Sequence, residues 1–73
     1  MKSHFKEYDV VFATRDINER VVKGVIGCIM LVYDAENFEV EFIVDSPLGN
    51  TDDVLAVTID DIALATEFIS TGE

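Results

Sequence analysis

Residues 24–44, GVIGCIMLVYDAENFEVEFIV, decide the fold of this chain. In their second half, FEVEFIV, phenylalanine and valine alternate with glutamate, and Ile43 alone breaks the polar series. Such a period of two is typical of a β-strand that buries one face. The first half, residues 24–33, is almost wholly apolar and contains two glycines, each of which costs a helix about 1 kcal/mol. The four residues DAEN between the two runs have the length of a hairpin turn, so the stretch predicts two antiparallel strands.

The flanking sequence adds further strand signals. Residues 8–13 (YDVVFA) and 54–59 (VLAVTI) predict strands, residues 14–23 and 45–53 predict loops, and residues 60–62 predict one helical turn. Residues 63–69 fit either a strand or a short helix. Gly27 within an apolar strand indicates a bulge or a tight bend. We therefore expect an all-β fold, a small five-stranded SH3-like barrel with one short helical turn. It would form a single domain over residues 1–73, with loose ends at 1–6 and 70–73.

Several short motifs resemble a known family. They are YDVV at 8–11, TRDI at 14–17, GVIG at 24–27, VYD at 32–34 and EVEF at 39–42. Over residues 7–65 the chain is similar to small, uncharacterised bacterial SH3-like proteins grouped as a domain of unknown function. The resemblance implies the barrel fold and carries no catalytic residues. It also implies a context like that of immunity proteins or antitoxins encoded beside bacterial toxins.

Charge is distributed unevenly along the chain. All five Lys and Arg residues lie within the first 23 positions, whereas residues 24–73 hold 11 acidic residues and no basic one, and the formal net charge is −10. A domain of this charge repels nucleic acid and anionic membranes and attracts basic protein surfaces. The longest near-apolar run, residues 25–33, is too short to span a membrane. We expect a cytoplasmic protein whose partner is a basic protein, with direct nucleic-acid and membrane binding excluded and the oligomeric state open.

The residues that catalysis requires are scarce. The only histidine, His4, lies in the N-terminal arm, and the only cysteine, Cys28, lies in the most apolar segment, where a thiol is usually a small buried hydrophobe. One Cys and one His do not make a zinc site, and the carboxylates lack the spacing of a calcium loop. We therefore expect no enzyme activity, no metal and no cofactor.

Acidic and apolar residues of the second half are the candidate partner contacts. The acidic candidates lie in the hairpin and in the loop after it, and Tyr33 and Leu48 are candidate apolar anchors. Glu39 and Glu41 share a strand face about 7 Å apart, a spacing close to that of successive phosphates. An ordinary solvated face, with charges that discourage edge pairing, remains the alternative. The acidic candidates are Asp34, Glu36, Glu39, Glu41, Asp52 and Asp53.

Three functions fit these features. The first is an acidic protein-binding module that neutralises a cationic partner, most concretely an immunity protein or antitoxin for a bacterial toxin. The second is a phage-type inhibitor that mimics nucleic acid. The third is a structural SH3-like accessory subunit, for which an exposed apolar stripe such as Ile43 with Phe12 or Phe68 would be the signature.

Overall fold

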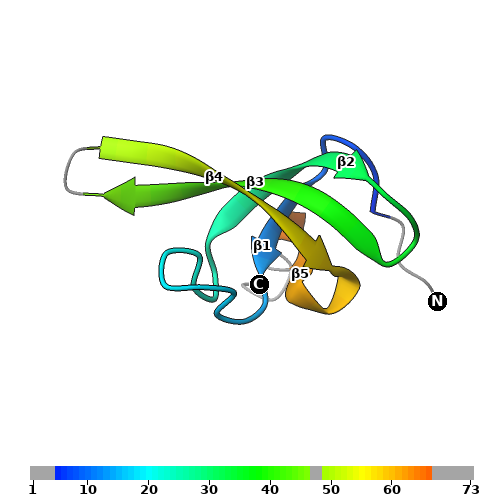
Figure 1. Cartoon of the computed structure of the whole chain (residues 1–73), viewed down its shortest axis with the longest axis horizontal. Coiled ribbons are helices and arrows are strands. Elements are labelled where there is room, and N and C mark those ends of the chain that lie inside the picture. The colour runs from blue at the N-terminus through cyan, green and yellow to red at the C-terminus, as the bar shows by residue number, and fades with distance from the viewer. Residues whose placement is uncertain (1–4, 47–48, 67–73) are drawn as a thin grey trace.

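A computed structural model describes residues 5–46 and 49–66 of this chain. The described residues form five strands and one short 3-10 helix, in the order shown in Figure 1. The elements are β1 (Val10–Ala13), β2 (Ile26–Val32), β3 (Asn37–Ser46), β4 (Gly49–Thr58), η1 (Ile59–Asp61) and β5 (Ile62–Leu64). The predicted all-β class, the five strands and the helical turn are confirmed.

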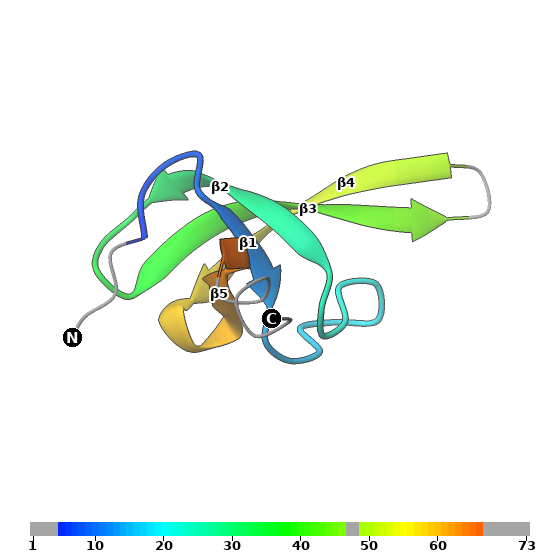
Figure 2. The same cartoon turned by 180° about the vertical axis from the view of Figure 1, so that it is seen from behind.

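All five strands belong to one antiparallel sheet with the order β4-β3-β2-β1-β5. The strands at its two ends, β4 and β5, form no ladder with each other in the described part of the chain, so the sheet is open. The closed SH3-like barrel that the element order suggested therefore stays a prediction. Figures 1 and 2 show the sheet strongly twisted, with β5 and η1 lying below the crossing of β3 and β4.

The alternating stretch builds the core as its pattern predicts. Phe38, Val40, Phe42 and Val44 are all buried on one face of β3, and they pack with buried residues of β1, β2, β4 and β5. Each fully buried aliphatic or aromatic side chain contributes about 1.5–3 kcal/mol to folding. The face of the sheet that carries these residues is called the inner face below, and the opposite face is called the outer face.

Gly27 serves close packing and makes no bulge. It pairs regularly with Val11 of β1 and Phe42 of β3, and the register shift of β2 lies instead between Ile29 and Leu31. A Cβ atom at Gly27 would lie 2.8 Å from side-chain carbons of both Val40 and Phe42. The bulge that was one of the two options at Gly27 is therefore absent there, and the glycine is needed because core side chains of β3 lie against it.

The segment 45–53 was predicted as a loop, but its described residues, 45–46 and 49–53, extend the strands β3 and β4. The ladder continues through Asp45↔Asn50 to Ser46↔Gly49, so β4 begins five residues before the predicted strand. Gly49 has a φ of +119°, a conformation that favours glycine where the chain reverses. Turn-forming residues are tolerated here because β3 and β4 run beyond β2 as a two-stranded ribbon, as Figure 1 shows.

The C-terminal part of the described chain closes against the first loop. Thr14 donates its backbone N–H to the carbonyl of Asp61 at 2.8 Å, and Arg15 binds the Asp61 carboxylate. Ile62–Leu64 forms a strand and Ala65–Thr66 are helical. Residues 63–69, for which a strand and a short helix were both open, therefore begin as a strand. The rest of 63–69, including Phe68, lies outside the described residues.

At the other end, Phe5 packs its ring edge-on against Phe38 with centroids 5.3 Å apart. Phe5 belongs to the arm predicted to be loose. Residues 1–4, with His4, and residues 70–73 lie outside the described part. Across residues 5–46 and 49–66 we find no helix with the length and hydrophobicity that crossing a membrane would take.

Candidate functional site

The outer face of the sheet combines exposed aliphatic residues with carboxylates. The register places Val10, Cys28, Glu41 and Val54 in one row across four strands, because directly paired residues of a ladder share a face. Ile26 of β2, Ile43 of β3 and Asp52 of β4 each lie two positions along their strand from this row. They are therefore on the same face, because side chains alternate between faces along a strand. The aliphatic side chains are well exposed: Val10 is 50% exposed, Ile26 40%, Ile43 52% and Val54 52%.

Glu41 and Asp52 form the acidic centre of this face. Glu41 pairs with Val54 and Ile43 pairs with Asp52, so the two carboxylates are diagonal neighbours across β3 and β4. Their hydrogen-bonding contact, together with the repulsion between their charges, raises the pKa of Glu41 above its ordinary value of 4.5. A like charge this close disfavours the ionised form of the carboxyl.

Three of the five basic residues form ion pairs away from the outer face. Within the described residues the ion pairs are Lys6–Asp9 at 3.6 Å, Arg15–Asp61 at 2.6 Å and Arg20–Asp53 at 2.9 Å. Each of these pairs neutralises an acid outside the outer face. No ion pair within residues 5–46 and 49–66 therefore neutralises Glu41 or Asp52.

Asp53 does not join Asp52. Neighbouring residues of a strand point to opposite faces, so Asp53 lies on the inner face beside Thr51. The guanidinium of Arg20 donates from Nε and Nη2 to the two carboxylate oxygens of Asp53, at 2.9 and 3.2 Å, and from Nη2 to the Thr51 hydroxyl at 2.7 Å. Asp53 as a partner contact stays a prediction, and its carboxylate already has an internal partner in Arg20.

The residues of the β2–β3 turn form a separate group. Asp34 accepts the backbone N–H of Glu36 at 2.8 Å and the side-chain amide of Asn37 at 2.9 Å, and these hydrogen bonds lower the pKa of Asp34. Tyr33 donates its hydroxyl to Glu39 at 2.6 Å, which raises the pKa of the Tyr33 phenol. Asp34 thus shapes the turn, while Tyr33 and Glu36 remain exposed.

The eight predicted contact residues are therefore divided by the fold. Glu39, Glu41 and Asp52 share the outer face; Tyr33, Asp34 and Glu36 lie at the hairpin turn; Asp53 is on the inner face. Leu48 lies outside the described residues. The aliphatic residues of the outer face were missed as anchors, although Ile43, which broke the alternation of its strand, was the signal in the sequence.

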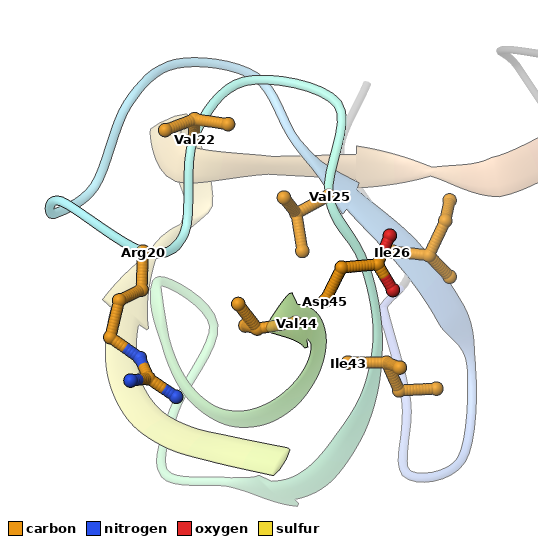
Figure 3. A pocket seen from close by; sticks show the side chains of 7 residues that line it. All are labelled: Arg20, Val22, Val25, Ile26, Ile43, Val44 and Asp45. Atoms are coloured by element: carbon orange, nitrogen blue, oxygen red, sulfur yellow. The ribbon is translucent and has the colours of Figure 1, made fainter. Parts of the chain in front are cut away.

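A pocket opens where β2 and β3 separate. Its volume is about 530 Å³. Figure 3 shows Val25 and Val44 near its centre, with Arg20 on one side and Asp45 and Ile26 on the other. This pocket could not be predicted from the sequence, because it forms between the first long loop and the end of β3. Its lining residues are Arg20, Val22, Val25, Ile26, Ile43, Val44 and Asp45.

The described residues contain no group of three or more His, Cys, Asp or Glu side chains placed to hold a metal ion. Cys28 is half-buried on the outer face, and its thiol lies 3.8 Å from the carbonyl oxygen of Ile29.

Comparison of the sequence with curated proteins and with solved structures finds no match. The family described as "Domain of unknown function (DUF4926)" matches residues 7–64, a span that begins just before β1 and ends with β5. The match covers most of the chain and every strand of the sheet, so this chain belongs to the DUF4926 family.

Proposed function

We propose that this chain is an acidic protein-binding module that neutralises a cationic protein. The observation that carries the proposal is the outer face, where exposed aliphatic residues surround the carboxylates of Glu41 and Asp52 and no base of the described residues compensates them. Complementary charge would accelerate association, and the aliphatic residues would supply the desolvated centre that holds the complex. The module would act by stoichiometric binding, without catalysis.

The most concrete form of this function is an immunity protein or antitoxin that binds a bacterial toxin in the cytoplasm. Its support is the net charge of −10 and the resemblance to small bacterial proteins in toxin–antitoxin contexts. We further propose that the open sheet belongs to the SH3-like class. This is supported by the order of a strand, a long loop, a strand, a tight hairpin, two further strands, a helical turn and a final strand.

Charge reversal tests the binding function. Tagged protein is used to capture partners from the native host, and the affinity of the captured basic protein is then measured at low and moderate salt. Reversal of Glu39 and Glu41 together to lysine should weaken binding by about 10- to 100-fold and flatten its salt dependence. The matched control reverses Glu7 and Glu19, which are exposed acids outside the sheet, and should change affinity by less than about 3-fold.

Growth assays test the immunity role. Expression of the captured protein alone should arrest growth, and co-expression of this chain should restore it. A captured protein that is harmless by itself would refute the immunity role while leaving the binding function intact. Equal loss of affinity in the E39K/E41K and E7K/E19K variants would refute the outer face as the binding surface.

A second function, that of an accessory subunit, is favoured by the exposure of Val10, Ile26, Ile43 and Val54 on one face. An apolar subunit interface of this kind would bind with little dependence on salt. Retention of a single partner by the E39K/E41K variant at all salt concentrations would therefore favour the accessory role. A nucleic-acid mimic gains no such support, because aliphatic residues interrupt the carboxylates of the outer face.

A further inference from the structure

The pocket beside β3 has a free strand edge as one wall. β2 pairs with β3 from Val32↔Phe38 to Gly27↔Phe42, whereas β3 pairs with β4 as far as Ser46↔Gly49. Residues 43–46 of β3 thus have a strand neighbour on the β4 side and none among the described residues on the β2 side. On that open side lies the pocket, bounded across from β3 by the loop that carries Arg20, Val22 and Val25.

We propose that this pocket receives an extended segment of the cationic partner, which adds to β3 as a short strand in line with β2. The proposal rests on the binding function proposed above and names its recognition element. Strand addition is a common mode of peptide recognition, in which the backbone ladder supplies affinity and side-chain pockets supply specificity. Here the edge and the side-chain pocket occur together.

The faces of β3 define the side chains of the occupant. A residue placed opposite Val44 would lie on the inner-face side, above the aliphatic surface of Val22, Val25 and Val44, and must therefore be apolar. A residue placed opposite Asp45 would lie on the outer-face side, where Asp45 is exposed, and is best a lysine or arginine. The occupant is thus an extended segment in which aliphatic and basic residues alternate.

Charge also selects a basic segment over a second copy of this chain. Asp45 lies on the same face as Asp52 and Glu41, and Arg20 is already neutralised by Asp53. A second copy, with a net charge of −10, would bring its own Asp45 and Asp52 toward these acids. Like charges placed opposite each other destabilise a ladder.

The pocket and the outer face are continuous, since Ile26 and Ile43 belong to both. An added strand along residues 43–46 is only about 13 Å long, which alone gives weak binding. The segment would therefore fix the register of the partner, while the rest of the partner covers the outer face.

The test uses a synthetic peptide with the sequence Lys-Val-Lys-Val-Lys, acetylated and amidated at its ends. Titration to about 2 mM should shift the backbone amide signals of residues 43–46 and the methyl signals of Val22 and Val25 in NMR spectra of the full chain. The same peptide N-methylated at every residue keeps its side chains and charge but loses its backbone donors, and should not bind. A Glu-Val-Glu-Val-Glu peptide should not bind either.

A matched pair of variants locates the site. Ile43 and Val54 are each 52% exposed on the outer face, but only Ile43 lines the pocket. Ile43→Lys should weaken peptide binding by at least about 10-fold, whereas Val54→Lys, with the same change of charge, should weaken it by less than about 3-fold. Because both positions are exposed, each variant should retain the fold, and its amide spectrum checks this.

Several outcomes would overturn the strand-addition proposal: no shift at residues 43–46, equal losses in the two variants, undiminished binding of the N-methylated peptide, or shifts confined to the outer edge of β4. None of these would affect the binding function, which depends on the reversal of Glu39 and Glu41. Conversely, the peptide could bind specifically at the pocket while the E39K/E41K variant keeps the partner affinity of the parent. That result would refute the outer face as the binding surface and would support the pocket as a peptide site.

Discussion

Gly27 is the residue on which the contact between β2 and the core side chains of β3 depends. A Cβ atom there would lie 2.8 Å from Phe42 Cδ1, 2.8 Å from Val40 Cγ1 and 2.9 Å from the carbonyl oxygen of Glu41. Phe42 and Val40 are fully buried, so neither can move aside without disturbing the core.

We therefore predict that Gly27→Ala lowers the free energy of unfolding by about 1–3 kcal/mol, as overpacking of a close-packed core does. Urea denaturation measures the change. Met30→Ala, an exposed position of the same strand, should cost less than about 1 kcal/mol. A Gly27→Ala protein as stable as the parent would show that β2 and β3 do not approach as closely as described.

The carboxylates of Glu41 and Asp52 make stability depend on pH. Because the folded pKa of Glu41 is raised above its ordinary 4.5, the folded state binds more protons than the unfolded state between the two values. The free energy of unfolding therefore falls as pH rises through this window, and at neutral pH the repulsion between the two groups persists.

Asp52→Asn should return the pKa of Glu41 toward its ordinary value, remove this pH dependence and stabilise the protein at neutral pH. NMR titration of the Glu41 carboxyl carbon, with parallel denaturation at several pH values, measures both effects. Glu36→Gln removes an exposed acid of the hairpin turn and should leave the pKa of Glu41 unchanged. An unaltered Glu41 titration in Asp52→Asn would contradict the pairing.

At the scale of elements, the β3–β4 ribbon is held at its base by Arg20. The loop between β1 and β2 places this guanidinium against Asp53 and Thr51 of β4, in a bidentate arrangement that lysine cannot reproduce. Beyond this contact β3 and β4 pair only with each other among the described residues, because the ladder of β2 with β3 ends at Gly27↔Phe42.

Arg20→Lys should thus loosen the ribbon with little effect on the rest of the sheet. We expect faster hydrogen exchange at the amides of residues 51–53, unchanged exchange in β1, and a loss of less than about 1 kcal/mol in overall stability, since the pair is partly exposed. Lys23→Gln removes a cation from the same loop and should leave exchange unaltered. Uniform acceleration across all strands in Arg20→Lys would show that Arg20 supports the whole fold.

For the whole molecule, the net charge of −10 sets a long-range penalty on folding. The described ion pairs are partly exposed and few, so we expect repulsion among the remaining acids to outweigh them. Because salt screens this repulsion, the free energy of unfolding should rise as NaCl increases from about 0.01 to about 0.3 M.

Denaturation at a series of NaCl concentrations measures this slope. The slope should be smaller for the E39K/E41K variant. Each Glu→Lys reversal changes the net charge by about +2, so the net charge changes from −10 to about −6. Less repulsion then remains for salt to screen. A parent protein that loses stability with added salt would show that its ion pairs, rather than its repulsions, dominate.

The sequence by itself determined the strand pattern and the side of β3 that is buried, because a period of two is a local property that burial of one face imposes. It also determined the excess of acid and the helical turn at Ile59–Asp61, whose Asp61 accepts a hydrogen bond from the backbone N–H of Thr58 at 2.9 Å. These features need only neighbours along the chain.

Only the tertiary structure decided which acids act together. Asp52 and Asp53 are adjacent in sequence, yet the register places Asp52 beside Glu41 and Asp53 beside Arg20, 33 positions away. It also decided that residues 45–46 and 49–53, rich in turn formers, pair as a ribbon, and that β2 ends early enough to leave a pocket beside Ile43. Strand register and the point where a ladder ends are set by packing between distant segments, and composition and local spacing do not encode them.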